Sequence, residues 1–161
     1  MTVKTNIKAI SELLKLDFFI PSYQRGYRWD EHQVTELLDD IWDFYNIPNK
    51  QEGEFYCLQP VIVKYDGNQY RLIDGQQRLT TFLIFMKVLC LKLGQTALFD
   101  CQFRIMGQMI ALRHGRNDIQ AFEKVMTLSK AEIIDNPEPT SRIIGAFNYF
   151  VEHIDESKLD I

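Results

Sequence analysis

The stretch "QYRLIDGQQRLTT", residues 69–81, determines the fold more clearly than any other part of the sequence. Residues 69–73 are typical of a β-strand, and residues 79–93 form a long, almost entirely apolar helical pattern that ends at Gly94. A helix that is apolar on nearly all sides belongs in the centre of a core. Gly75 lies between the strand and the helix, so the stretch predicts a strand, a tight turn and a buried helix in direct succession.

The segment before this stretch predicts a β-hairpin. Residues 61–65 are also strand-like, and Asp66-Gly67-Asn68 between the two strands is a typical turn sequence. The hairpin therefore leads directly into the buried helix. We expect an α+β fold with a small sheet, a central helix and additional helices towards the C-terminus.

Two helices are predicted before the hairpin. Asn6 is the N-cap candidate for a short helix, which carries four apolar residues at helical spacing: Ile7, Ile10, Leu13 and Leu14. Asp30 and Gln33 have the spacing of a capping box, followed by an apolar stripe that reaches Tyr45. The acidic residues of that second helix, Glu36, Asp39, Asp40 and Asp43, are interpreted as its solvated side rather than a metal site.

The last third of the sequence is less regular. Residues 99–112 fit a strand or a helix, and the pattern does not decide between them. A helix follows Asn117 or Asp118, residues 136–139 form a loop, and Ser141 opens a final helix. We interpret residues 1–161 as one domain, with a core motif region at 18–94 and a helical extension at 95–161.

Composition excludes several classes of protein. The 161 residues are 46% hydrophobic and 25% charged, which is ordinary for a globular domain. A net charge of −4 excludes a protein that coats nucleic acid through bulk charge. Three cysteines without a CxxC pair indicate a reducing compartment, and neither a signal peptide nor a membrane span is predicted. We therefore expect a cytoplasmic protein.

The turn at Gly75 has features of an anion site. Free backbone N–H groups and the positive dipole end lie at a helix N-terminus, so the amides of Gln76, Gln77 and Arg78 are candidates for holding a phosphate. The Arg78 guanidinium adds charge, and Asp74 either caps the helix or holds a magnesium ion or a water. The residues alone leave a second interpretation open, in which the turn is purely structural.

A second cluster, "PSYQRGYRW" at residues 21–29, combines two arginines with three aromatic residues. Arginine interleaved with aromatic rings suits phosphate contact together with stacking on a base. In the alternative interpretation, the aromatic side chains fill the core and the arginines pair with the acidic helix that follows.

Together the two clusters resemble a known family. "IPSYQRGYRW", then a hairpin and "LIDGQQRLTT", is similar to the N-terminal domain of GmrSD-type restriction proteins, which have a ParB/sulfiredoxin-like fold. The segments "RNDIQAFEKV" at 116–125 and "SRIIGAFNYF" at 141–150 resemble its weaker downstream pattern. One departure lies near Gln59, where the family usually carries a glycine, and it leaves the local backbone shape there in doubt.

The resemblance implies binding and hydrolysis of a nucleoside triphosphate with Mg²⁺. It assigns Asp74 and Arg78 to catalysis, and no resident metal ligands are predicted. The implied nucleotide-binding residues are Tyr23, Gln24, Arg25, Tyr27, Gly75, Gln76, Gln77 and Arg78. Family members act in defence against foreign, often modified phage DNA, and couple nucleotide use to a nuclease domain of the HNH type.

That nuclease is not predicted within these residues, because an HNH unit needs clustered histidines. His32, His114 and His153 are far apart in the sequence. We therefore expect a fragment of a larger protein, or a partner of a separate nuclease, that does not itself cleave DNA. Two alternatives remain: a module that docks a partner, and a non-catalytic DNA-sensing module whose phosphate contacts are Arg25, Arg28, Arg104, Arg113 and Arg116.

Overall fold

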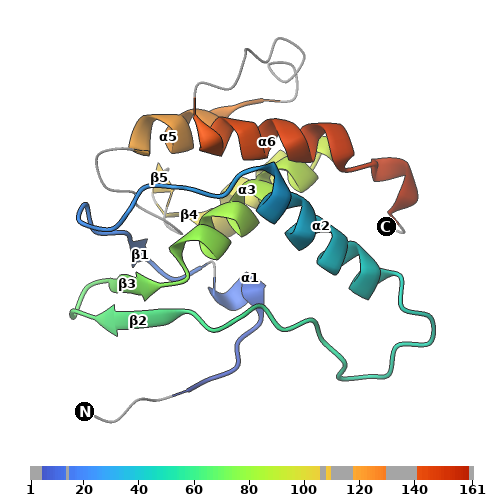
Figure 1. Ribbon diagram of the computed structural model, residues 1–161, viewed down its shortest axis with the longest axis horizontal. Helices are drawn as coiled ribbons and strands as arrows, with labels where there is room; N and C mark the ends of the chain where they lie inside the picture. Colours follow the sequence, from blue (N-terminus) through green and yellow to red (C-terminus); the bar gives the residue numbers. More distant parts are fainter. Residues whose placement is uncertain (1–4, 14, 106–107, 110–117, 130–140, 160–161) are drawn as a thin grey trace.

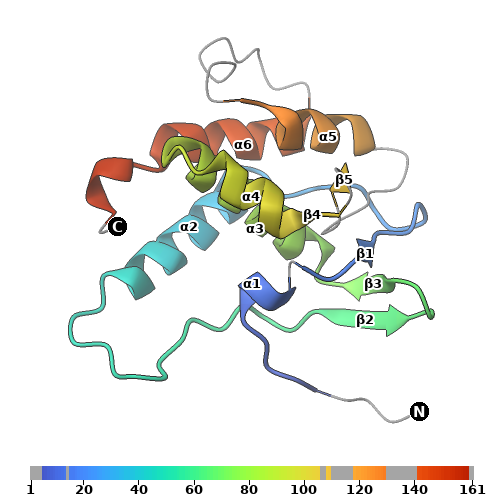
Figure 2. The same cartoon turned by 180° about the vertical axis from the view of Figure 1, so that it is seen from behind.

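The computed structural model describes residues 5–13, 15–105, 108–109, 118–129 and 141–159. A small three-stranded sheet lies beside a group of helices, and α3 passes through the middle of the molecule (Figures 1 and 2). The architecture is α+β, as predicted; its likeness to ParB and sulfiredoxin stays a prediction. The elements in chain order are α1 Ile10–Leu13, β1 Phe18–Phe19, α2 Glu31–Tyr45, β2 Ile62–Tyr65, β3 Tyr70–Asp74, α3 Gln76–Lys92, α4 Thr96–Phe103, β4 Arg104–Ile105, β5 Gln108–Met109, α5 Ile119–Thr127, α6 Arg142–His153 and the 3-10 helix η2 Glu156–Lys158.

The sheet has the strand order β1-β3-β2. β2 and β3 form the predicted antiparallel hairpin, with Tyr65 opposite Tyr70 and a turn in which Gly67 has φ +100°. β1 runs parallel to β3 and pairs Phe18 with Tyr70. The sheet thus brings the chain that enters the 21–29 loop next to the strand that leads into α3.

Helix α3 forms the centre of the core, as its apolar sequence predicts. Leu83, Ile84, Val88 and Leu91 are fully buried, and α6, α4 and α5 pack against this helix. The helix ends before Gly94, whose φ of +68° favours glycine and breaks the helical path. A rigid, buried α3 holds the residues at its N-terminus in fixed positions relative to the sheet.

The capping box of α2 is confirmed. The Asp30 carboxylate accepts from the backbone N–H of the first turn, and the Gln33 side chain accepts from the Asp30 N–H at 2.9 Å. The first helix is shorter than predicted, because α1 begins only at Ile10 and Ile7 is 82% exposed before it. Without tertiary packing, a single N-terminal turn has little to stabilise it. Leu14 lies outside the described residues.

The region from residue 95 onwards contains helices and also a short strand pair. The segment that the sequence left undecided ends helix α4 at Phe103 and continues into β4, which pairs antiparallel with β5. The final helix begins as predicted, because Ser141 accepts from the Ile144 N–H at 3.3 Å. The predicted loop at 136–139 lies outside the described residues.

Candidate functional site

The turn between β3 and α3 requires glycine for two reasons. Gly75 has φ +94°, a backbone angle that residues with a side chain rarely adopt, and an added Cβ would lie 3.1 Å from Cγ2 of Val61. The space beside this glycine is therefore filled by Val61 of the chain itself. The strand-to-helix junction is consequently closed on the Val61 side.

The N-terminus of α3 has free donors. Gly75 is the N-cap and the helix has no side-chain cap hydrogen bond, so of the alternatives left open for Asp74, capping of the helix is not the one observed. The first helical hydrogen bond is donated by the Leu79 N–H to the Gly75 carbonyl. Within the described part of the chain, the N–H groups of Gln76, Gln77 and Arg78 have no acceptor, so they remain available to an anion.

Gln76 is buried next to these donors and connects them to the 21–29 loop. Its side chain is 7% exposed and donates to Oε1 of Gln24 at 3.3 Å, while Gln24 donates to the Ile73 carbonyl at 3.2 Å. Oε1 of Gln76 has no hydrogen-bond partner among the described residues. A buried acceptor without a partner costs about 1–3 kcal/mol. It marks a position that a ligand donor or a water molecule would complete.

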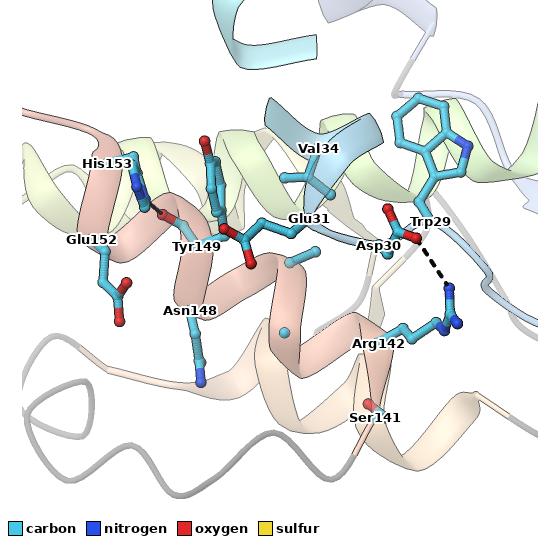
Figure 3. A pocket seen from close by; sticks show the side chains of 12 residues that line it. Trp29, Asp30, Glu31, Val34, Ser141, Arg142, Asn148, Tyr149, Glu152 and His153 are labelled. Carbon is cyan, nitrogen blue, oxygen red and sulfur yellow. Dashed lines mark hydrogen bonds and ion pairs between the residues drawn. The ribbon is translucent and has the colours of Figure 1, made fainter. Parts of the chain in front are cut away.

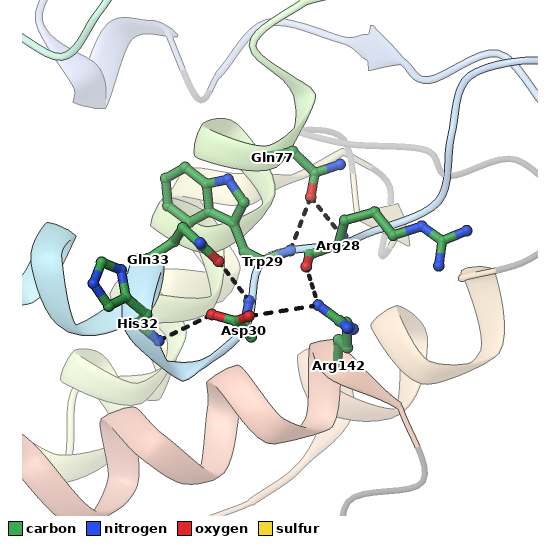
Figure 4. Close-up of polar contacts among 7 residues, drawn as sticks. All are labelled: Arg28, Trp29, Asp30, His32, Gln33, Gln77 and Arg142. Atoms are coloured by element: carbon green, nitrogen blue, oxygen red, sulfur yellow. Dashed lines mark hydrogen bonds and ion pairs between the residues drawn. The ribbon is translucent and has the colours of Figure 1, made fainter.

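Gln77 holds the backbone of the 21–29 loop. Its Oε1 accepts from the N–H of Arg28 at 2.7 Å and of Trp29 at 3.3 Å (Figure 4). Its Nε2 donates to the Gly26 carbonyl at 3.2 Å. The side chain is thus engaged within the protein. For a phosphate, the group that Gln77 still offers is its backbone N–H.

Tyr27 also supports the loop from inside. It is 6% exposed, and its hydroxyl lies 2.7 Å from Oγ1 of Thr81 on α3. Burial raises the pKa of Tyr27, so the phenol stays protonated at neutral pH. Its backbone N–H donates to Oδ2 of Asp118 at 2.6 Å. The structure therefore places the Tyr27 side chain in the core rather than on a ligand-facing surface.

Asp118 and Arg142 are two contributors that sequence reasoning missed. Asp118 precedes α5 but makes no side-chain cap hydrogen bond to that helix; its carboxylate instead reaches the loop. Arg142, at the start of α6, donates to the Arg28 carbonyl and lies 4.0 Å from Oδ2 of Asp30 (Figure 4). The "RND" before α5 suggested an N-cap, so no local signal distinguished this long-range role.

Tyr23 and Arg25 are two of the exposed residues of the loop, together with Ser22 and Arg28. Tyr23 is 70% exposed, and Arg25 has no side-chain partner within the described chain. Gln24 between them is hydrogen-bonded to the β3–α3 junction. One aromatic ring and one guanidinium group are therefore available beside that junction.

Arg78 is held by the segment before β2. Its NH1 donates to Oε1 of Gln59 at 3.1 Å and its NH2 to the Pro60 carbonyl at 2.8 Å. Oδ2 of Asp74 lies 4.0 Å from NH2, and the Asp74 side chain is 63% exposed. A phosphate bound at NH1 and NH2 would compete with these carbonyl partners, whereas the buried Nε has no partner among the described residues. Gln59, close to which a departure from the family pattern was expected, is therefore in direct contact with Arg78.

Two cavities in the described part of the chain lie elsewhere. One, of about 690 Å³, lies between the start of α2 and helix α6, and Trp29, Glu31 and Tyr149 are among its lining residues (Figure 3). The second, of about 560 Å³, lies between α2, α3 and the end of α6. Neither of these two cavities is lined by residues 74–78.

The described residues contain no group of three or more His, Cys, Asp or Glu side chains suited to a metal ion. His32 lies 3.5 Å from Glu36, and the His153 ring stacks on Tyr149; His114 is outside the described residues, as are Arg113 and Arg116. None of the helices in the described ranges has the length and apolar character needed to cross a bilayer.

These observations define an α+β domain in which a strand, a glycine turn and a buried helix carry "DGQQR". Hydrogen bonds connect this junction to the loop at 21–29, which carries arginine and tyrosine residues. The sequence pattern of the GmrSD restriction endonuclease N-terminal domain matches residues 7–159, nearly the whole chain. The protein therefore belongs to the GmrSD N-terminal domain family. A search of the curated proteins found no match.

Proposed function

We propose that this domain binds a nucleoside triphosphate with Mg²⁺ at the β3–α3 junction and is the nucleotide-responsive part of a phage-defence restriction protein. In that protein it would act in the cytoplasm, together with a nuclease domain whose presence the words "restriction endonuclease" in the family name support. The observation that carries the proposal is the uncapped N-terminus of α3. Its three free N–H groups lie next to the buried, unpartnered oxygen of Gln76.

The surrounding side chains fit a phosphate group and its metal. The exposed Arg25 supplies a cation, and Arg78 supplies a second one once Gln59 and Pro60 are displaced. Asp74 is an exposed carboxylate at the end of β3, suited to a hydrated Mg²⁺. Tyr23 offers a ring face for base stacking. For hydrolysis, these residues would contribute positioning and charge, which are what phosphoryl transfer chiefly requires from a protein.

The test is calorimetric titration of ATP, GTP, CTP and UTP with Mg²⁺ into the protein. Arg25→Ala is the informative variant, because this side chain has no partner in the described structure and its loss leaves the fold intact. We expect affinity to fall about tenfold or more, the value of a charge-assisted contact. Lys124→Ala, which removes one exposed charge from α5, is the matched control and should bind normally. Absence of binding at millimolar nucleotide would contradict the proposal.

DNA sensing is the second candidate function, and the exposure of both Arg25 and Arg28 on one loop favours it. Binding of plain or modified duplexes would then weaken with salt and with Arg28→Ala, without an effect of nucleotide. Binding of nucleotide that is insensitive to Arg28→Ala distinguishes the first function from the second. For Arg104, which begins β4, the backbone position alone is described.

A further inference from the structure

Helix α2 buries its apolar stripe along only part of its length. Val34 and Leu37 near its start are 1% and 6% exposed, whereas Ile41 and Trp42 are half-buried and Tyr45 at its end is 38% exposed. In both views α2 lies against α6 at its N-terminal end and diverges from the helical body towards its C-terminal end (Figures 1 and 2). The second half of the stripe therefore faces a gap that no described element fills.

That gap is a groove of about 560 Å³, which we call the α2 groove. Its walls are α2, the second half of α3, the end of α6 and η2. Most of its lining side chains are apolar: Leu38, Ile41, Trp42, Tyr45, Phe85, Leu89, Leu93, Ile154 and Leu159. An apolar groove between helices is the kind of surface that accepts the apolar face of another helix.

The rim of the α2 groove is acidic on its open side. Asp39 lines it, and Asp43, one turn further along α2, is exposed. The one lysine among the lining residues, Lys158, lies 3.4 Å from Asp155, so its charge is compensated. His153 stacks on Tyr149 and contacts that residue's carbonyl through Nδ1 at 2.8 Å. The α2 side of the rim therefore carries negative charge without a partner among the described residues.

We infer that the α2 groove is a docking site for an amphipathic helix of a partner protein, with apolar anchors at spacings of three and four residues and lysine or arginine beside them. The apolar floor sets the helical spacing. The acidic rim sets the charge, because complementary charges favour the encounter and like charges oppose it. The site is separate from the β3–α3 junction and does not depend on nucleotide binding.

The rim argues against other occupants. A second copy of this chain that presented its own α2 would bring Asp39 and Asp43 against the same residues. Anionic lipid headgroups would meet the same repulsion. A small apolar ligand would gain nothing from the acidic rim. A basic helix is the occupant that uses both the floor and the rim.

The test uses two synthetic peptides of roughly four helical turns with the same leucine stripe, one with lysine and the other with glutamate at the remaining positions. Fluorescence anisotropy is measured on titration with the intact chain. We expect saturable binding of the lysine peptide, about tenfold or more tighter than that of the glutamate peptide. In a Trp29→Phe background, the fluorescence emission of Trp42, which lines the groove, should shift to shorter wavelength when the peptide binds.

Two charge-reversal variants separate groove binding from general attraction to an acidic protein. Asp39→Lys changes the rim, and Glu123→Lys makes the same change of net charge on the exposed face of α5. We expect Asp39→Lys to lower the affinity for the lysine peptide about tenfold and Glu123→Lys to leave that affinity unchanged. The inference would be overturned if both variants had equal effects or if peptide binding did not saturate. It would also be overturned if the chain associated with itself and Asp39→Lys abolished that association.

Discussion

The two segments on either side of α2 are attached to the core in opposite ways. The loop at 21–29 is held through its backbone by side chains from three other elements: Gln77, Asp118 and Arg142. The segment at 46–61 is mostly exposed: Leu58 and Val61 pack against the core, and its hydrogen bonds to other elements are a few side-chain bonds, such as Tyr56 to Asp40 at 2.8 Å. A loop whose own amides are paired by partly buried groups is fixed before a ligand arrives. An exposed segment can change its contacts at low cost.

The same difference divides the site into a fixed part and an adjustable part. Gln24 and Gln76 connect the fixed loop to the β3–α3 junction, so the exposed Tyr23 and Arg25 extend from a rigid base. Arg78, by contrast, faces the adjustable segment through Gln59 and Pro60. The substitutions below test whether the two segments really differ, beginning with the largest expected effect.

Gln77→Leu should be the most damaging substitution. It keeps a side chain of similar size but leaves the N–H groups of Arg28 and Trp29 and the Gly26 carbonyl without partners. We expect the free energy of unfolding to fall by about 3 kcal/mol, measured by urea denaturation. Gln59→Leu in the adjustable segment is the matched control, with an expected loss below about 0.5 kcal/mol. Equal losses would remove the distinction between the two segments.

Asp118→Ala should have the next largest effect. The 2.6 Å bond from the Tyr27 N–H to its carboxylate is charge-assisted and partly buried, so its loss should cost about 1–2 kcal/mol. Asp118→Asn retains a neutral acceptor and should recover roughly half of that loss. Thermal unfolding of both variants checks the order. A variant Asp118→Ala as stable as the parent chain would show that the loop does not need this contact.

Much of the fold was predictable, because it depends on local signals. The capping box of α2, the turn at Gly67 and the arrest of α3 at Gly94 each follow from residues a few positions apart. The sequence also identified Gly75 correctly as a turn. It did not predict that Val61 fills the space beside it, because that contact depends on how the hairpin packs.

The roles within the site were less predictable than its location. Gln77 and Tyr27 belong to the quoted motifs, yet their partners lie about 50 residues away in the sequence, and only tertiary packing brings them together. Asp118 has the appearance of a helix cap and acts on a loop 91 residues earlier. Strands of two residues, such as β4 and β5, contain too few side chains for the hydrophobic periodicity to distinguish a strand from a helix.

Tyr27→Phe should have a smaller effect that depends on pH. Loss of the 2.7 Å hydroxyl contact with Thr81 should lower the free energy of unfolding by about 1 kcal/mol at pH 7. Burial raises the pKa of Tyr27 above its unfolded value of about 10. The folded state therefore holds the proton more tightly, and this residue makes stability fall as pH rises above about 10. Unfolding measured between pH 8 and about 11 should show a smaller decline in the variant.

Gln59→Ala is the change with the smallest expected effect on stability and the most informative one for ligand binding. Its bond to Arg78 lies at the surface, so the free energy of unfolding should change by less than about 0.5 kcal/mol. If the proposed phosphate takes Arg78 from this segment, removal of one competitor should tighten nucleotide binding about two- to threefold, because the bond given up is worth about 0.5 kcal/mol. Limited proteolysis adds a second measurement: nucleotide should increase cleavage within residues 46–61 and leave residues 21–29 protected. Cleavage that nucleotide does not alter would mean that Arg78 keeps its partners, and that Arg25 and the amides of α3 bind the phosphate without it.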